Sequence, residues 1–131
     1  MPKGKILIVD DEPDVRDAMR MQLETASYNV LEAENGEEAI KILKSEDNMV
    51  NVGVILCDIR MPKVNGLECI QYFRQEAPGI PTVVVTAYPE AEMAAGLMTT
   101  GVKDYLVKPV EKEKLLGVVG ELVAAGKDFE F

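Results

Sequence analysis

The chain has 131 residues, of which 47% are hydrophobic and 28% are charged, a composition typical of one globular domain that can bury a core. Its net charge of −9 argues against direct binding of nucleic acid, which requires clustered lysine and arginine. The sequence contains no histidine, which excludes Ser-His-Asp and Cys-His catalysis, histidine-ligated metals and a phosphohistidine carrier.

Nothing in the sequence predicts export or insertion into a membrane. Met1-Pro2-Lys3-Gly4 leads directly into a strand pattern rather than into a signal peptide. No apolar run approaches the roughly 20 residues that span a bilayer. Cys57 and Cys69 lie inside predicted elements, which is typical of buried thiols in a reducing compartment. We therefore expect a cytoplasmic protein that does not associate with membranes.

The first third of the chain alternates between strand and helix patterns. An apolar run at 5–9 predicts a buried strand. Pro13 suits the first position of a following helix, and Asp11 or Glu12 is available to cap that helix. A second, shorter strand is predicted at 29–33.

The middle of the chain continues this alternation. Asn35-Gly36 opens a second helix, and the polar segment 46–53 that follows this helix is predicted to be a loop. A third strand is expected at 54–57. Apolar residues at helical spacing then predict a helix over 67–76.

The last part of the chain adds two strands and two helices. The strands are predicted at 82–85 and 104–107, because both are short apolar runs bounded by polar or turn residues. A helix expected at 90–99 has only a sparse apolar stripe, which is typical of a mobile segment. A longer amphipathic helix is predicted at 112–125.

This regular alternation predicts an α/β fold, a doubly wound parallel sheet with helices on both faces. The strands are continuously apolar rather than alternating, which is typical of strands that are buried on both sides. We find no internal repeat, linker or low-complexity stretch. The pattern therefore predicts a single domain over 1–131, with its core at about 5–125.

Four of the predicted strands run into residues that could handle a phosphoryl group. They end at Asp10-Asp11, Asp58, Thr86 and Lys108-Pro109. Ligands of open α/β sheets bind just outside the carboxyl ends of the strands. Two carboxylates about 4 Å apart repel by roughly 4 kcal/mol at an effective dielectric near 20. Such a cluster therefore needs a proton or a cation, and Mg²⁺ is the natural candidate.

Each of these residues also has an ordinary structural interpretation. The acidic residues after the first strand could cap a helix or favour its dipole, and Asp58 could form a turn. Thr86 could be a simple strand-end threonine, Lys108 a solvated lysine and Tyr105 a half-buried aromatic. It is the combination at one sheet edge that favours a site for a divalent cation and a phosphate-like group.

The ordered set of motifs is more specific than any one of them. The stretches are 6–13, 58–62 with Asn65-Gly66, 85–87 and 104–109. On these motifs the chain resembles the receiver domains of response regulators in two-component signalling, over about 5–125. The resemblance implies a five-stranded parallel sheet in the order 2-1-3-4-5, as in flavodoxin. The segment 46–53 is several residues longer than in most receivers.

The resemblance also implies roles for individual residues. Asp58 would be the phosphoacceptor, which takes a phosphoryl group from a phosphohistidine of a histidine kinase or phosphotransfer protein. Mg²⁺ would be bound by Asp11, by Asp10 through water, by Asp58 and by the backbone carbonyl of Arg60. Lys108 would pair with the phosphoryl oxygens.

Further implied features concern the switch that follows phosphorylation. Thr86 would hydrogen-bond the phosphoryl group, and Tyr105 would swing inward behind it. The Lys108-Pro109 peptide would be cis. A downstream protein partner would read the change on the face built from 90–99, 104–107 and 112–125. Such a protein is a switch rather than an enzyme, either as a monomer or as a phosphorylation-dependent dimer.

Other interpretations remain open at this stage. The chain could be a stand-alone receiver, a receiver excised from a longer transcriptional regulator or hybrid kinase, or a degenerate receiver that works without phosphorylation. A Mg²⁺-dependent phosphatase with an aspartyl nucleophile would carry Asp-x-Asp after its first strand, whereas this chain has Asp10-Asp11. A flavin-binding carrier would need a Ser/Thr/Gly-rich phosphate loop at that position.

Overall fold

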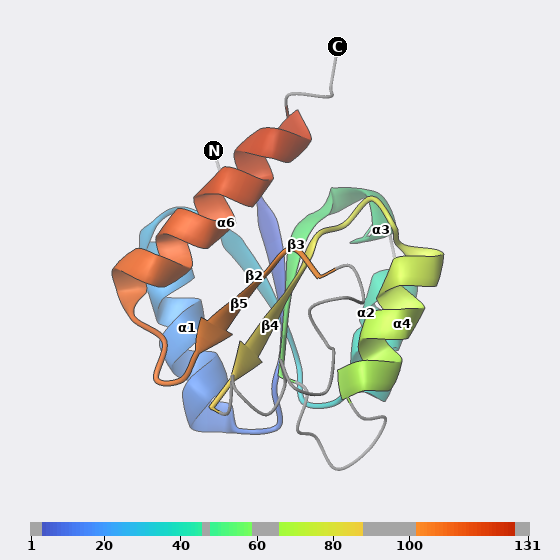
Figure 1. Ribbon diagram of the computed structural model, residues 1–131, viewed down its shortest axis with the longest axis horizontal. Coiled ribbons are helices and arrows are strands. Elements are labelled where there is room, and N and C mark those ends of the chain that lie inside the picture. Colours follow the sequence, from blue (N-terminus) through green and yellow to red (C-terminus); the bar gives the residue numbers. More distant parts are fainter. Residues whose placement is uncertain (1–3, 46–47, 59–65, 88–101, 128–131) are drawn as a thin grey trace.

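The computed structural model describes residues 4–45, 48–58, 66–87 and 102–127 (Figure 1). Five parallel strands form one sheet in the order β2-β1-β3-β4-β5, which confirms the predicted fold class and strand order. The strands are β1 (Lys5–Val9), β2 (Asn29–Ala33), β3 (Val52–Asp58), β4 (Thr82–Thr86) and β5 (Asp104–Val107). The helices are α1 (Pro13–Thr25), α2 (Gly36–Lys44), α3 (Asn48–Asn51), α4 (Gly66–Glu76) and α6 (Lys112–Lys127).

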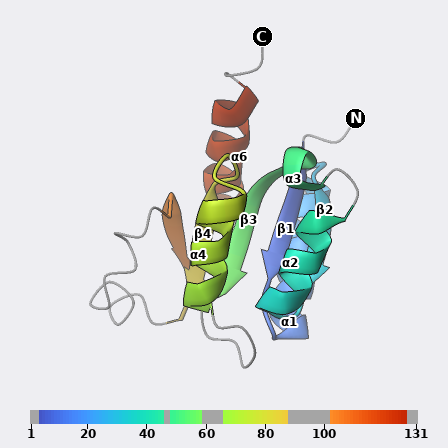
Figure 2. The same ribbon diagram turned by 90° about the vertical axis from the view of Figure 1, so that its right-hand side faces the viewer.

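Helices cover both faces of the sheet. Helices α1 and α6 lie on one face, and α2 and α4 lie on the other (Figures 1 and 2). The core under α1 and α6 includes the fully buried side chains Ile6, Ile8, Leu23, Val54, Leu56, Leu115 and Val119. The core under α2 and α4 includes Leu7, Val9, Ala39, Leu43, Ile55, Cys57 and Phe73. Two cores therefore hold the central strands from both sides.

Burial on both faces explains why the strands are continuously apolar. Successive side chains of a strand point to opposite faces, so a central strand between two helix layers needs apolar residues at every position. Ile6 and Ile8 of β1 enter one core and Leu7 and Val9 enter the other, and all four are inaccessible to solvent.

Most predicted elements have the bounds expected from the sequence, with small extensions. Strands β2 and β5 match their predicted ranges, and β4 is one residue longer because it includes Thr86. Helix α2 begins after Asn35, whose side chain accepts a hydrogen bond from Glu38 N–H at 2.9 Å. The predicted helix 90–99 lies outside the described residues. Within the described part of the chain, no helix is long and apolar enough to cross a membrane.

The prediction of a loop over 46–53 was wrong for residues 48–53, the part of this segment that the structure describes. Helix α3 occupies Asn48–Asn51, and β3 already begins at Val52. The cause is Asn48, a polar residue that is nevertheless buried. Its amide group donates to the carbonyl of Ile42 at 2.7 Å, and its Oδ1 accepts from Lys5 Nζ at 3.3 Å. These two bonds satisfy the side chain in the interior and tie α3 to α2 and to β1.

We expect Asn48→Ala to lower the free energy of unfolding by about 1–3 kcal/mol, since it leaves the partly buried carbonyl of Ile42 without this donor. Urea denaturation measures the change. Asn51→Ala is the matched control, because Asn51 belongs to the same short helix but is exposed, and its effect should stay within about 0.5 kcal/mol. Equal effects of the two substitutions would contradict a special role for Asn48.

Candidate functional site

The register of the parallel sheet brings the predicted site residues to one edge. Strands β1 and β3 pair so that Asp10 and Asp58 occupy matching positions at the ends of neighbouring strands. Strands β4 and β5 pair so that Thr86 lies beside the residue that precedes Lys108. Lys108 N–H donates to the carbonyl of Thr86 at 2.8 Å, which extends the β4–β5 pairing by one step.

The Lys108 ammonium lies at the centre of this edge. Its Nζ is 2.9 Å from Asp10 Oδ2, 3.0 Å from Asp58 Oδ2 and 3.1 Å from Glu12 Oε1. The Lys108 side chain is 14% exposed, and the Asp10 and Asp58 side chains are 0% and 5% exposed. Water screens charges weakly at such depth, so these ion pairs are stronger than surface pairs.

Two opposing influences act on the pKa of Lys108. Burial disfavours the charged form and lowers the pKa, and it is the largest single influence. Contacts with the carboxylates of Asp10, Asp58 and Glu12 favour the charged form, and together they outweigh burial and raise the pKa above its ordinary value of 10.5. Lys108 is therefore a permanent cation at neutral pH.

Asp10 is held at its backbone and at one carboxylate oxygen. Its N–H donates to the carbonyl of Ala33 on β2 at 3.1 Å, and its Oδ1 accepts from Glu12 N–H at 2.9 Å. Its Oδ2 lies within ion-pair distance of Lys108 but has no hydrogen bond of good geometry among the described residues. Burial raises the pKa of Asp10, as does the nearby Asp58, while the Glu12 amide and Lys108 lower it; the net shift is upward.

Glu12 has a different role from the one predicted. It occupies the N-cap position of α1, but its side chain makes no capping hydrogen bond. The carboxylate instead lies 3.1 Å from the Lys108 ammonium. The sequence offered one signal for this contact, the unbroken acidic run Asp10-Asp11-Glu12 at the end of a strand.

Four carboxylates converge at this edge. One oxygen each from Asp10, Asp11, Glu12 and Asp58 lies within 4.8 Å of the others. Together they outnumber the single ammonium of Lys108, so the cluster retains excess negative charge. Hard carboxylate oxygens are the ligands that Mg²⁺ prefers, and Asp10 Oδ2 still lacks a full hydrogen-bond complement. The donor set therefore fits a small divalent cation. Arg60, the other predicted ligand, lies outside the described residues.

The two predicted switch residues lie on the neighbouring strands β4 and β5. Thr86 ends β4 and is buried, and Tyr105 on β5 is half-buried and packs against the apolar cluster of Ile70, Val84 and Val102. The Lys108-Pro109 peptide is cis, as the resemblance implied.

The raised pKa of Asp10 makes a prediction about stability and pH. The folded protein holds this proton more tightly than the unfolded chain does, so Asp10 lowers the free energy of unfolding as pH rises above about 4. Asp10→Asn cannot ionise. We expect the free energy of unfolding of Asp10→Asn, minus that of the wild type, to become more positive between about pH 4 and pH 7.

Urea denaturation at several pH values without added divalent cations measures this difference. Lys108 stays charged throughout that range, so it adds no slope of its own. Asp14→Asn is the control, because Asp14 is an exposed carboxylate of the first turn of α1 outside the cluster. A flat or falling difference for Asp10→Asn would contradict the prediction.

Residues 6–120 match the protein family described as "Response regulator receiver domain". The chain therefore belongs to this family, in agreement with the resemblance seen in its motifs. Among solved structures, the chain is similar to a response regulator receiver domain protein from Clostridium thermocellum. The two share 26% sequence identity with a TM-score of 0.85, over 95% of this chain and 97% of the other.

Similar sequences occur both as short chains and as parts of long ones. The chain is 36% identical to the response regulator protein PilR of Pseudomonas aeruginosa over 95% of its own length, but this covers only 26% of PilR. It is 34% identical to an uncharacterised 14.6 kDa protein of Leptolyngbya boryana, over 92% of this chain and 90% of that protein.

Proposed function

We propose that this chain is a phosphorylation switch in which Asp58 accepts a phosphoryl group in a Mg²⁺-dependent step. One observation carries the proposal: the Asp58 carboxylate shares the Lys108 ammonium with Asp10, at the carboxyl edge of the sheet. Membership of the receiver domain family supports the same role. We propose that residues from about 5 to 125 form one receiver domain.

In this mechanism an oxygen of Asp58 attacks the phosphorus of the donor. A new P–O bond forms as the bond between phosphorus and the donor breaks, and the product is an acyl phosphate. A bound Mg²⁺ would neutralise charge and favour the incoming phosphate. Asp11, Asp58 and the carbonyl of Arg60 would hold the ion directly, and Asp10 would hold it through water. Phosphoryl transfer depends mainly on such positioning and charge stabilisation.

The remaining residues act on the product. Lys108 would turn from the carboxylates to the phosphoryl oxygens, since a phosphoryl group carries more negative charge and three strong acceptors. The Thr86 hydroxyl would donate a further hydrogen bond from the next strand. Tyr105 would follow inward and change the face that includes β5 and α6. These steps would convert a local change of charge at Asp58 into a change between two states of the partner-binding surface.

The proposed partners follow from this chemistry. A cytoplasmic histidine kinase or phosphotransfer protein would supply the phosphoryl group, and a downstream protein would read the face that includes β5 and α6. PilR and the CAI-1 autoinducer sensor kinase/phosphatase CqsS of Vibrio cholerae contain similar segments within longer chains. We propose the same switching role for this chain whether it acts alone or as part of a longer protein. It would act as a monomer or as a phosphorylation-dependent dimer.

Incubation with acetyl phosphate and Mg²⁺, followed by intact mass measurement, tests the proposal. We expect the wild type to gain the mass of one phosphoryl group, and Asp58→Asn to gain none because an amide cannot form the acyl phosphate. Omission of Mg²⁺ should reduce the gain strongly.

Asp17→Asn is the control for loss of an aspartate, because Asp17 lies on α1 with a side chain 54% exposed and should gain mass like the wild type. No gain in the wild type requires a second measurement, of beryllofluoride binding in the presence of Mg²⁺. Binding would indicate a short-lived phosphate, whereas no binding would contradict the proposal and favour a receiver that works without phosphorylation.

A further inference from the structure

The backbone carbonyl of Asp10 accepts a hydrogen bond from an arginine of the neighbouring helix. Arg16 on α1 directs its guanidinium at the end of β1, and Nη1 donates to the Asp10 carbonyl at 2.6 Å. The Arg16 side chain is only 16% exposed. This contact links a side chain of α1 to the backbone of the acidic turn.

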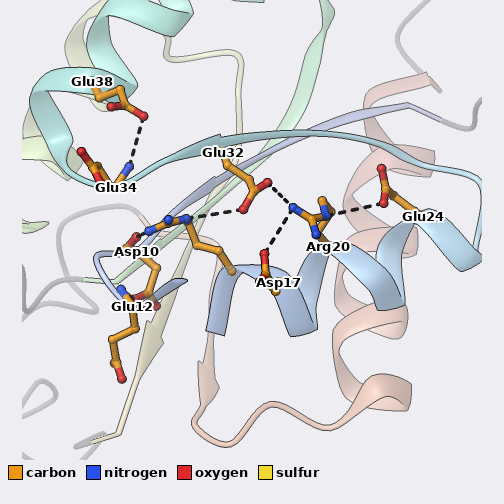
Figure 3. A network of polar contacts seen from close by, with 9 residues as sticks. Asp10, Glu12, Asp17, Arg20, Glu24, Glu32, Glu34 and Glu38 are labelled. Carbon is orange, nitrogen blue, oxygen red and sulfur yellow. Dashed lines mark hydrogen bonds and ion pairs between the residues drawn. The ribbon is translucent and has the colours of Figure 1, made fainter. Parts of the chain in front are cut away.

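Glu32 on β2 holds Arg16 in place. Glu32 Oε1 is 3.4 Å from Arg16 Nε, and Glu32 Oε2 accepts from Arg20 Nη1 at 2.7 Å. Figure 3 shows these contacts, with Glu32 between the acidic turn and Arg20. Arg20 also pairs with Asp17 and Glu24 and is 35% exposed. The two arginines therefore share the Glu32 carboxylate. Among the described contacts, Arg16 also reaches the Asp10 carbonyl, whereas Arg20 does not.

Arg16 provides the third of three restraints on the position of Asp10. The Asp10 N–H is held by β2, one carboxylate oxygen is held by the Glu12 amide, and the carbonyl is held by Arg16. The position of Oδ2, which faces Lys108, follows from these three restraints. A guanidinium only donates hydrogen bonds, so Arg16 adds positive charge next to the carboxylates without competing as a metal ligand.

We propose that Arg16 is a positioning residue for the cation site, and that it acts by fixing the turn that carries Asp10 and Asp11. The inference rests on the Mg²⁺ site of the proposed function. Glu32 supports Arg16 in this role. Arg20 contacts the other carboxylate oxygen of Glu32 and has no contact with the acidic turn among those described. Groups that orient metal ligands in this way typically change metal affinity by about 10–100-fold when they are removed.

Isothermal titration calorimetry with MgCl₂ tests the inference on the whole chain. We expect Arg16→Gln to raise the Kd for Mg²⁺ by about tenfold, at the low end of that range. Arg16→Lys should fall between Arg16→Gln and the wild type, because an ammonium keeps the charge but cannot span both the carbonyl and Glu32. Arg20→Gln is the matched control because it removes a charge from the same network. It should keep the wild-type Kd, because the described contacts of Arg20 do not include the acidic turn.

Thermal unfolding with and without Mg²⁺ separates positioning from general stability. A merely structural role would lower the Tm of Arg16→Gln equally in both conditions. The positioning role predicts that the increase in Tm on addition of Mg²⁺ becomes smaller in Arg16→Gln but not in Arg20→Gln. If Arg16→Gln fails to fold, Arg16→Lys and Glu32→Gln replace it, and both should then weaken Mg²⁺ binding.

The outcomes distinguish this inference from the proposed function. A wild-type chain that takes up no Mg²⁺ would overturn the metal site itself and this role with it. Mg²⁺ binding by the wild type, with an unchanged Kd in the Arg16 variants, would overturn only the role of Arg16. A Kd raised as much in Arg20→Gln as in Arg16→Gln would also overturn it, because the effect would then come from charge alone.

Discussion

The ion pairs between Lys108 and the carboxylates of Asp10 and Asp58 join parts of the chain that lie far apart in sequence. They form only when β1, β3, β4 and β5 are paired in the observed register, because each residue is placed by the end of its own strand. A shift of one residue in a strand would turn its side chains to the opposite face. The site therefore depends on the packing that fixes this register.

That packing also determines which parts of the site are rigid. The central strands are buried on both faces, so the carboxylates at their ends are attached to the most constrained part of the molecule. The acidic turn after β1 has no such support from the sheet beyond Asp10, and helix α1 supplies it through Arg16. The core thus sets the position of Asp58, and polar contacts set the positions of Asp10 and the residues that follow it.

Much of the fold could be predicted because the strands are short apolar runs with sharp polar ends. The same ends predicted which residues gather at the edge of the sheet, including Asp10, Asp58 and Lys108. The burial of Asn48 could not be predicted, because its polar side chain is typical of a loop until its two hydrogen-bond partners are known. The contact of Glu12 with Lys108 was missed for a similar reason, since local sequence favours a helix cap and gives no information about a lysine 96 residues away. Contacts between distant polar residues depend on tertiary structure rather than on local pattern.

The position of Lys108 means that the cluster carries its own counter-ion. A metal ion that binds Asp10 and Asp58 would meet carboxylates that Lys108 already partly neutralises. Its affinity would therefore reflect a competition between the metal and the ammonium for the same oxygens. An anion that draws Lys108 to itself would release these carboxylates and tighten the metal. By thermodynamic reciprocity, a bound metal would then favour the anion to the same degree. One shared lysine would in this way couple the two ligands.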